Sequence, residues 1–375
     1  MRRILLLALG SFALGTDAFI VAGLIPDISA ETGIAEGDVG QLVTVFTVCF
    51  AVSGPLLSSV LRFDTRTLLL TAMAVFTLGN VGSALSDSLA ALLLTRAVAG
   101  IGAGLYSPTA AATAAALAPP GQRGRALSLI LAGLSIGTVV GVPLGLMLAA
   151  DLGWRSAFWL VSALGVLAAL GIWRLVPRIA LTAPPGVRDR LATLFDPRVA
   201  PVVAVSLLFN VASLGLYTYI APILQITAGV DSPLPFLWAW GVGGVIGALA
   251  IGPLIDRASS ATRVMPAVLG VFILAAAAIT PAGGALLVVG IALGAWGAAG
   301  FASPPPQQHL LLERAPDRGV SAVAVNGSAI YLGGAVGSGL GGVALHLQVS
   351  AAVLPLIAAG IGAVALVTYL VFVDR

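Results

Sequence analysis

Long apolar runs, separated by short polar or proline- and glycine-containing breaks, dominate the pattern along this chain. A helix needs about 20 mostly apolar residues to cross a hydrocarbon core roughly 30 Å thick, because each residue adds about 1.5 Å. Runs of this length predict twelve transmembrane helices, with ends placed to within a few residues. The predicted helices cover residues 4–26, 39–60, 67–86, 89–117, 126–149, 154–176, 199–227, 233–254, 264–281, 284–311, 319–345 and 350–372.

The longest polar stretch, residues 177–198, divides the predicted helices into two groups of six. It is rich in residues that break helices and form turns, which are Pro177, Pro184, Pro185, Gly186 and Pro197. We therefore predict an all-α membrane protein. An N-terminal six-helix bundle covers 1–176, a cytoplasmic linker covers 177–198, and a C-terminal six-helix bundle covers 199–375.

Two short sequences recur at matching places in the predicted halves. The sequence GPLL at 54–57, at the end of the second helix, returns as GPLI at 252–255, at the end of the eighth. The sequence APPGQRG at 118–124, before the fifth helix, resembles APDRG at 315–319, before the eleventh. Two helical halves repeated in parallel are typical of transporters whose halves rock about a substrate site.

The composition excludes a soluble domain. The chain has 375 residues, of which 59% are hydrophobic and 9% charged, and its mean hydropathy is +1.08.

The basic start at Arg2 and Arg3, followed by an apolar run, also fits a signal peptide. We favour a first transmembrane helix, because the run is long enough to span and no small-residue cleavage site precedes Asp17.

The arginines predict the orientation. All basic residues are arginine, and with a cytoplasmic N-terminus every one except Arg96 and Arg155 falls in a cytoplasmic segment. Cytoplasmic loops collect basic residues, so both termini are predicted to be cytoplasmic. The formal net charge of +3 does not indicate nucleic-acid binding, because these arginines are dispersed over short loops.

Two charged residues lie well inside predicted helices. Asp17 interrupts the first apolar run, and Arg96 lies at a similar depth in the fourth helix. An ionisable residue in a membrane span costs roughly 2.5 to 3.5 kcal/mol, and it usually faces a partner or a water-filled path. We favour a carboxyl group that exchanges a proton as its balance between burial and the guanidinium changes. The alternative is a structural ion pair that fixes the packing of the first and fourth helices.

Glycines recur every four residues in two of the predicted helices. The fifth helix carries Gly133, Gly137, Gly141 and Gly145, with Pro143 in the sequence GVPLG at 141–145, and the eleventh carries Gly333, Gly337 and Gly341. This spacing places small residues on one helix face, which allows close backbone approach and sliding. The alternative is tight packing without a moving part.

Further polar residues form weaker candidates. The loop pair Asp256 and Arg257, and Asp64 with Arg66 in the matching loop, could latch one conformation, or they are ordinary solvated charges. Three prolines at 304–306 are expected to kink the tenth helix beside Gln307, Gln308 and His309. Polar residues that could line a substrate cavity are Asn210, Tyr217, Tyr219, Gln225, Asn326 and Tyr331.

An enzyme, a metal protein and an ATP-driven pump are all disfavoured. His309 and His346 stand alone, Cys49 is the single cysteine, and the chain has no lysine to complete a phosphate-binding loop. We expect no cofactor and no metal, and we expect transport to be driven by an ion gradient.

These motifs together resemble the major facilitator superfamily, and within it the twelve-helix drug:proton antiporter branch. That branch includes bacterial arabinose, sugar and purine efflux permeases and chloramphenicol-resistance exporters. The first-helix sequence LGTDAF at 14–19, the fourth-helix sequence TRAVAGIGAG at 95–104, and GWR at 153–155 with Phe158 are all similar to motifs of the branch. The fifth-helix sequence around Gly137 and 141–145 is the most diagnostic, because importers of the family generally lack it. The resemblance implies that Arg96 takes part in proton coupling.

Two positions depart from the pattern of the family. The loop motif is intact at Gly252, Asp256 and Arg257, but in the first half Ser58 stands where its aspartate belongs. Asp64 and Arg66 would replace that first latch only in part. Many relatives also have a glutamate where this chain has Ala18, so the proton stoichiometry could differ here.

We therefore predict a monomeric, multi-pass exporter of the bacterial inner membrane that exchanges protons for a small organic molecule. Asp17 carries the proton, Arg96 is its coupling partner, and Gly137, Gly141, Pro143 and Gly145 form the gate interface. A hydrophobic drug or antibiotic is favoured over a sugar or nucleoside, because polar residues in the presumed cavity are sparse. The remaining alternatives are a proton symport importer and a membrane sensor that transports nothing. The partners expected are the substrate, protons and the lipid bilayer, without nucleic acid.

Overall fold

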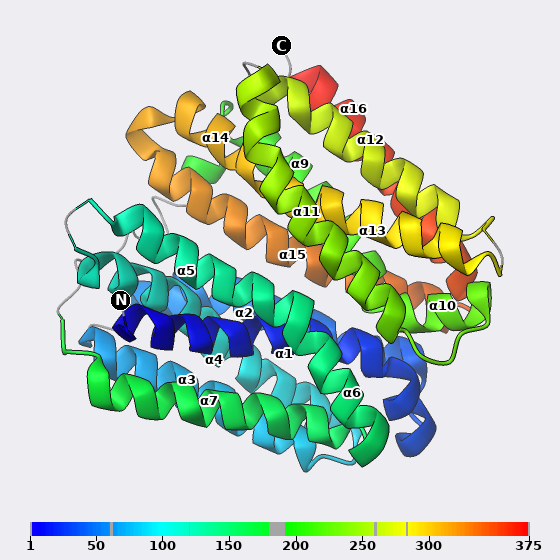
Figure 1. Ribbon diagram of the computed structural model, residues 1–375, viewed down its shortest axis with the longest axis horizontal. Helices are drawn as coiled ribbons and strands as arrows, with labels where there is room; N and C mark the ends of the chain where they lie inside the picture. The colour runs from blue at the N-terminus through cyan, green and yellow to red at the C-terminus, as the bar shows by residue number, and fades with distance from the viewer. Residues whose placement is uncertain are drawn as a thin grey trace. The chain divides into compact units, whose positions relative to one another are not determined.

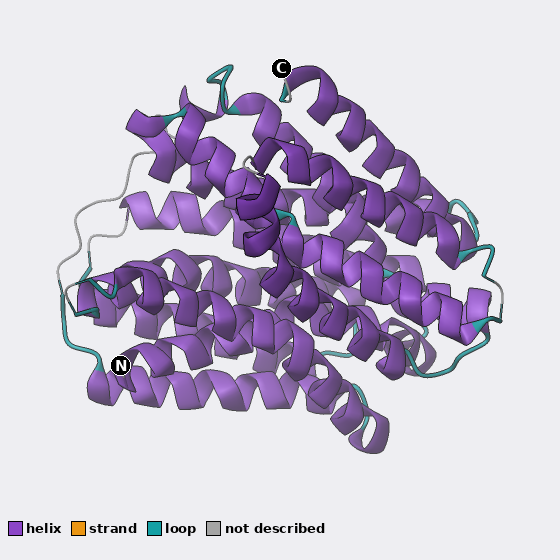
Figure 2. Cartoon of the chain, turned by 45° about the horizontal axis from the view of Figure 1, so that its top comes forward, coloured by secondary structure: helices purple, strands orange, loops and turns teal. Residues whose placement is uncertain are grey.

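The computed structural model describes residues 2–60, 63–119, 121–179, 192–258, 261–282 and 284–373. Within these ranges every regular element is helical and no strand occurs (Figures 1 and 2). Twelve helical segments in the described ranges are long and apolar enough to cross a membrane. The predicted all-α membrane fold is confirmed. Of the predicted linker, residues 180–191 lie outside the described residues, as do Arg62 and Arg375.

The chain forms two compact units, Met1–Pro184 and Pro185–Arg375. In the first unit α1 is the central helix and packs on α2, α4, α5, α6 and α7. The fifth spanning segment is continuous but changes its winding, because a π-helical turn, η1, separates α5 from α6. The elements of the first unit are α1 (Arg2–Thr32), α2 (Glu36–Val60), α3 (Thr65–Ala84), α4 (Leu89–Leu117), α5 (Arg123–Ile136), η1 (Gly137–Gly141), α6 (Val142–Leu152) and α7 (Arg155–Leu175).

The second unit has two broken spans. The seventh predicted helix divides at Tyr219. The tenth divides at Ser303, where the three prolines begin a new helix at the position of the predicted kink. The helices of the second unit are α9 (Ala200–Thr218), α10 (Ile220–Ala228), α11 (Leu234–Ala258), α12 (Ala261–Ile279), α13 (Leu286–Ala302), α14 (Pro304–Arg314), α15 (Gly319–His346) and α16 (Leu354–Phe372).

Asp64 caps the first turn of α3. Its carboxylate accepts hydrogen bonds from the backbone N–H of Thr67 at 3.1 Å and from the Thr67 hydroxyl at 2.7 Å. The pKa of this carboxyl is lowered, chiefly by the bond from the Thr67 hydroxyl and further by the charge of Arg178. The cap stabilises the fold above the unfolded pKa of about 3.9, and its contribution is lost as the pH falls through the folded pKa.

We expect Asp64→Asn to keep the cap at pH 7 but to remove this acid-dependent loss, because the amide oxygen still accepts the N–H. The unfolding midpoint in detergent, measured against pH, should therefore fall less steeply below about pH 4 than in the wild type. Ser88 caps α4 in the same way through the N–H of Ala91 at 3.3 Å. Ser88→Ala should lower stability by about 1 kcal/mol at every pH. An equally steep acid fall in Asp64→Asn would contradict the prediction.

Candidate functional site

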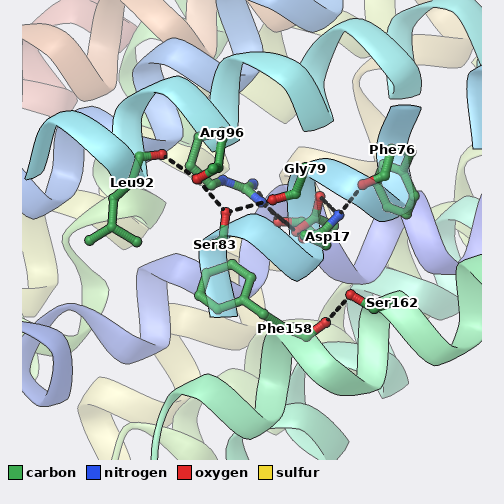
Figure 3. A network of polar contacts seen from close by, with 10 residues as sticks. Asp17, Phe76, Gly79, Ser83, Leu92, Arg96, Phe158 and Ser162 are labelled. Carbon is green, nitrogen blue, oxygen red and sulfur yellow. Dashed lines mark hydrogen bonds and ion pairs between the residues drawn. The ribbon is translucent and has the colours of Figure 1, made fainter. Parts of the chain in front are cut away.

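Asp17, Asn80 and Arg96 form a closed polar network inside the first unit. Figure 3 shows Asp17 and Arg96 with the hydrogen bonds around them. Nη1 of Arg96 donates to Oδ1 of Asp17 at 2.6 Å and to Oδ1 of Asn80 at 3.3 Å. Nη2 of Arg96 donates to the backbone carbonyl of Asp17 at 3.2 Å, and Nδ2 of Asn80 donates to Oδ2 of Asp17 at 3.1 Å. The two charged residues singled out in the sequence therefore form an ion pair, and an amide bridges them.

The ion pair is fully enclosed by the first unit. The side chains of Asp17 and Arg96 are 0% and 1% exposed. The Phe46 ring lies 4.3 Å from the guanidinium carbon and the Phe158 ring 5.6 Å from it, both within reach of cation–π attraction. Nε of Arg96 has no hydrogen-bond partner among the described residues. Because no solvent screens this pair, gain or loss of one proton changes its energy far more than at a surface.

Close helix packing brings these side chains together. A Cβ at Gly79 of α3 would be 2.4 Å from the backbone nitrogen of Ala99 in α4. A Cβ at Gly100 of α4 would be 2.4 Å from the carbonyl oxygen of Phe46 in α2. Only glycine permits such approaches. The small residues of the fourth-helix motif therefore set the distances at which Asn80 and Phe46 reach Arg96.

The glycine face of the fifth span packs against α1. A Cβ at Gly137 would lie 2.2 Å from the carbonyl oxygen of Phe12, and one at Gly141 would lie 1.9 Å from the hydroxyl of Thr16. Thr16 donates to the carbonyl of Gly137 at 3.2 Å, and Thr138 donates to the carbonyl of Gly15 at 3.3 Å. These contacts fall within η1, and π-helical turns often occur at functional sites. The motif thus contacts the residue immediately before Asp17.

Comparison with known proteins identifies the family. The sequence profile of the Major Facilitator Superfamily matches residues 7–338. The chain belongs to this family. It is therefore a multi-pass membrane transporter rather than an enzyme.

Relatives of this Major Facilitator protein include named transporters. It is 34% identical over 263 residues to a chloramphenicol resistance protein of Streptomyces lividans, with 67% of this chain and 66% of that protein aligned. It is 30% identical over 369 residues to the inner membrane transport protein YdhP of Escherichia coli O157:H7, with 97% and 94% aligned. The solved nucleoside transporter NupG superposes over 100% of both chains with a TM-score of 0.80 at 13% identity, a likeness of fold alone.

Two of the predicted cavity residues meet in a neutral polar cluster of the second unit. Ser206 and Asn326 both donate to Oε1 of Gln307, the latter at 3.5 Å. Asn210 donates to the carbonyl of Ser206 at 2.7 Å. Oδ1 of Asn326 is buried without a hydrogen-bond partner among the described residues. The broken tenth span brings Gln307 into this cluster, because α14 begins anew three residues before it.

The other cavity candidates of this transporter lie elsewhere. Tyr217 packs on Trp240 at 4.6 Å between ring centroids. The hydroxyl of Tyr219 donates to the carbonyl of Ser338 at 2.7 Å. Gln225 is exposed, and Tyr331 is partly buried. Tyr217 and Tyr219 therefore make contacts outside the cluster around Gln307.

The predicted latch residues make no ion pair in the part of the chain that the structure describes. Asp256 and Arg257 are exposed near the end of α11. In the first unit Asp64 caps α3, while Arg66 donates to the backbone carbonyl of Trp173. Side-chain detail at Ser58 lies outside the described residues. The latch remains a prediction for another conformation of the transporter.

Sequence reasoning missed Asn80 and Phe46 of the buried network, and it named Phe158 only as part of the motif at 153–158, without its contact to Arg96. Asn80 is an amide in the middle of the third predicted helix, at a depth that matches Asp17, and this position could have drawn attention to it. The contacts of Phe46 and Phe158 with Arg96 could not be found in this way, because aromatic residues are common in membrane helices and the rotation of each helix decides what its rings face. Within the described residues no group of His, Cys, Asp and Glu could hold a metal ion.

We expect Asn80→Ala to lower the free energy of unfolding by about 2 kcal/mol, because both charged partners lose a hydrogen bond in a dry site. Unfolding in mixed detergent measures this change. Ser162→Ala is the matched control, since the Ser162 hydroxyl donates at 2.8 Å to the carbonyl of Phe158 within its own helix. The free energy of unfolding should fall clearly less in this control than in Asn80→Ala. Equal losses would show that Asn80 serves only its own helix.

Proposed function

We propose that this transporter exports a small organic molecule, preferably a hydrophobic drug or antibiotic, in exchange for protons. It would do so in the bacterial inner membrane as a monomer, with both termini in the cytoplasm. The observation that carries the proposal is the dry Asp17–Arg96 ion pair, in which Asp17 directly follows Thr16, the residue that contacts Gly137 and Gly141 of the fifth span. A buried carboxylate with one basic partner is a group whose protonation depends on small changes in its surroundings.

Protonation of Asp17 would change the forces on α1. The ionised carboxylate accepts from Arg96 and Asn80 at once. A proton on Asp17 removes its charge and leaves the guanidinium of Arg96 unbalanced, which weakens the bond between α1 and α4. Because Thr16 is bonded to η1, a shift of α1 also displaces the fifth span. Proton binding would thereby be converted into movement between helices of the first unit.

The second unit joins its corresponding helices without charge. There Nε1 of Trp296 in α13 donates to the hydroxyl of Ser213 in α9 at 2.8 Å. This difference supports assigning proton exchange to the first unit. Efflux of a drug is supported by the fifth-helix motif and by the similarity to a protein named for chloramphenicol resistance.

Export of a sugar or nucleoside is the second candidate. The neutral cluster of Ser206, Gln307 and Asn326 supports it, because amides and hydroxyls are suited to hydroxyl-bearing substrates. Both candidates share the proton mechanism and differ in the substrate.

Efflux from cells that express the wild type tests both candidates. Chloramphenicol, other drugs, pentoses and nucleosides are each loaded, and their release is followed with and without an uncoupler. Uncoupler-sensitive release of a drug supports the first candidate, and release of a pentose or nucleoside supports the second. Accumulation driven by the proton gradient would instead show import. A protein that reaches the membrane but moves no compound would favour a sensor.

A further inference from the structure

Arg155, the first residue of α7, binds two carboxylates from two other elements of the first unit. One guanidinium nitrogen donates to Glu31 in the last turn of α1, and the other donates to Asp87 in the turn between α3 and α4. One side chain therefore joins α1, the α3–α4 turn and α7. We call Glu31, Asp87 and Arg155 the terminal triad.

The elements joined by the terminal triad are those that carry the buried network. Asp17 lies on α1, Asn80 on α3 and Arg96 on α4, while Phe158 lies on α7. Glu31 follows Asp17 on the same helix by roughly 20 Å. The triad therefore lies too far away to touch the network directly, and it acts on the ends of the helices that form it.

A line of ring contacts leads from the triad to the network. The guanidinium of Arg155 lies 4.3 Å from the ring centroid of Trp154. Trp154 meets Phe158 edge-on at 5.9 Å with an interplanar angle of 88°. The Phe158 ring in turn lies 5.6 Å from the guanidinium carbon of Arg96. Nε1 of Trp154 has no acceptor among the described residues, so packing rather than hydrogen bonding holds this ring.

We propose that Arg155 is a positioning residue that holds Asp17 and Arg96 in their paired geometry, through the helix ends and through Trp154 and Phe158. This gives the GWR sequence at 153–155 a physical role. A role of the Asp17–Arg96 pair in proton exchange rests on the proposed function. The positioning of these two side chains by Arg155 does not.

An arginine suits this position because its planar fork directs two N–H groups toward two acceptors while its face stacks on a ring. The three triad side chains are 29%, 52% and 84% exposed for Arg155, Glu31 and Asp87. Each exposed ion pair by itself is weak. A moderate effect on the network is therefore expected, smaller than that of changing Asp17 or Arg96.

Infrared spectroscopy of the purified protein tests the proposal. The carbonyl band of protonated Asp17 is the one that Asp17→Asn removes. Among the described residues, Arg96 is the charged group that faces Asp17. At a pH where about one tenth of wild-type Asp17 is protonated, Arg155→Gln should raise that fraction about threefold, because the balancing guanidinium is held less closely. Arg155→Lys, which keeps the charge without the fork, should give an intermediate fraction.

Arg66→Gln is the matched control, because Arg66 also ties α3 to α7 but does so near the other end of α7, at Trp173. It should leave the protonated fraction unchanged. If Arg155→Gln does not fold, Asp87→Asn at the exposed end of the triad replaces it, with a smaller rise expected. The proposal would be overturned if the protonated fraction of Asp17 in the triad variants equals that of the wild type, or if Arg66→Gln raises this fraction as much as they do. Absence of proton-coupled efflux in the wild type would refute the proposed function and leave the infrared result valid.

Discussion

Asp17→Asn is expected to abolish uncoupler-sensitive efflux and to lower the free energy of unfolding by about 3 to 5 kcal/mol. The first effect follows from loss of the exchangeable proton. The second follows because Arg96 would remain charged in a site where its side chain is 1% exposed. Efflux is measured in proteoliposomes with an imposed proton gradient, and stability by unfolding in mixed detergent.

The double variant Asp17→Asn with Arg96→Gln separates a functional pair from a structural one. It leaves neutral amides at both positions beside Asn80, so most of the lost stability should return. Efflux against a gradient should remain absent, because no group at this site can exchange a proton. Recovery of both stability and coupled efflux would show that the pair only fixes the packing of α1 and α4. Arg96→Gln by itself should also uncouple transport, since it leaves a buried carboxylate unbalanced.

Gly137→Ala is expected to reduce efflux by about 100-fold, because displacement of α1 by even 1 Å moves Asp17 from its partners. The added Cβ would lie 2.2 Å from the carbonyl oxygen of Phe12. Backbone cannot rotate away as a side chain can, so α1 and η1 must separate. Such overpacking typically costs about 1 to 3 kcal/mol, and separation would also weaken the hydrogen bond from Thr16 to Gly137.

Gly124→Ala is the control for this glycine prediction. Gly124 lies in α5 of the same span, and a Cβ there would meet nothing within 4 Å. Alanine favours a helix over glycine by about 0.5 to 1 kcal/mol in a helix interior, so stability should stay equal or rise slightly. Efflux by this variant should match the wild type. If Gly137→Ala behaves like Gly124→Ala, close contact between η1 and α1 is not required for transport.

The second unit repeats this packing, and among its described residues no ion pair joins α9 to α15. A Cβ at Gly337 of α15 would lie 2.1 Å from the carbonyl oxygen of Val211 in α9, just as Gly137 approaches α1. In each unit, a glycine face therefore allows the first and fifth spans to pack closely against each other. What distinguishes the first unit is that its close contact adjoins Asp17, and this is why we place proton exchange there.

The twelve helices and the two charges within them could be predicted from the amino-acid pattern. A bilayer offers no hydrogen bonds to the backbone, so any apolar run of sufficient length must become a helix, and run length is a local property. Depth along a helix is equally local, because each residue adds a constant rise. The similar depths of Asp17 and Arg96 could therefore be recognised before their contact was seen.

The side chains that complete the network could not be predicted in this way, because they depend on packing between helices. Asn80, Phe46 and Phe158 depend on the rotation of α3, α2 and α7 about their own axes, and such rotation is set by packing between helices far apart in sequence. The same holds for η1, whose altered winding places Gly137 opposite Thr16, and for Arg155, whose two acceptors come from distant segments. Local patterns place a residue along a helix, but contacts between helices decide what it faces.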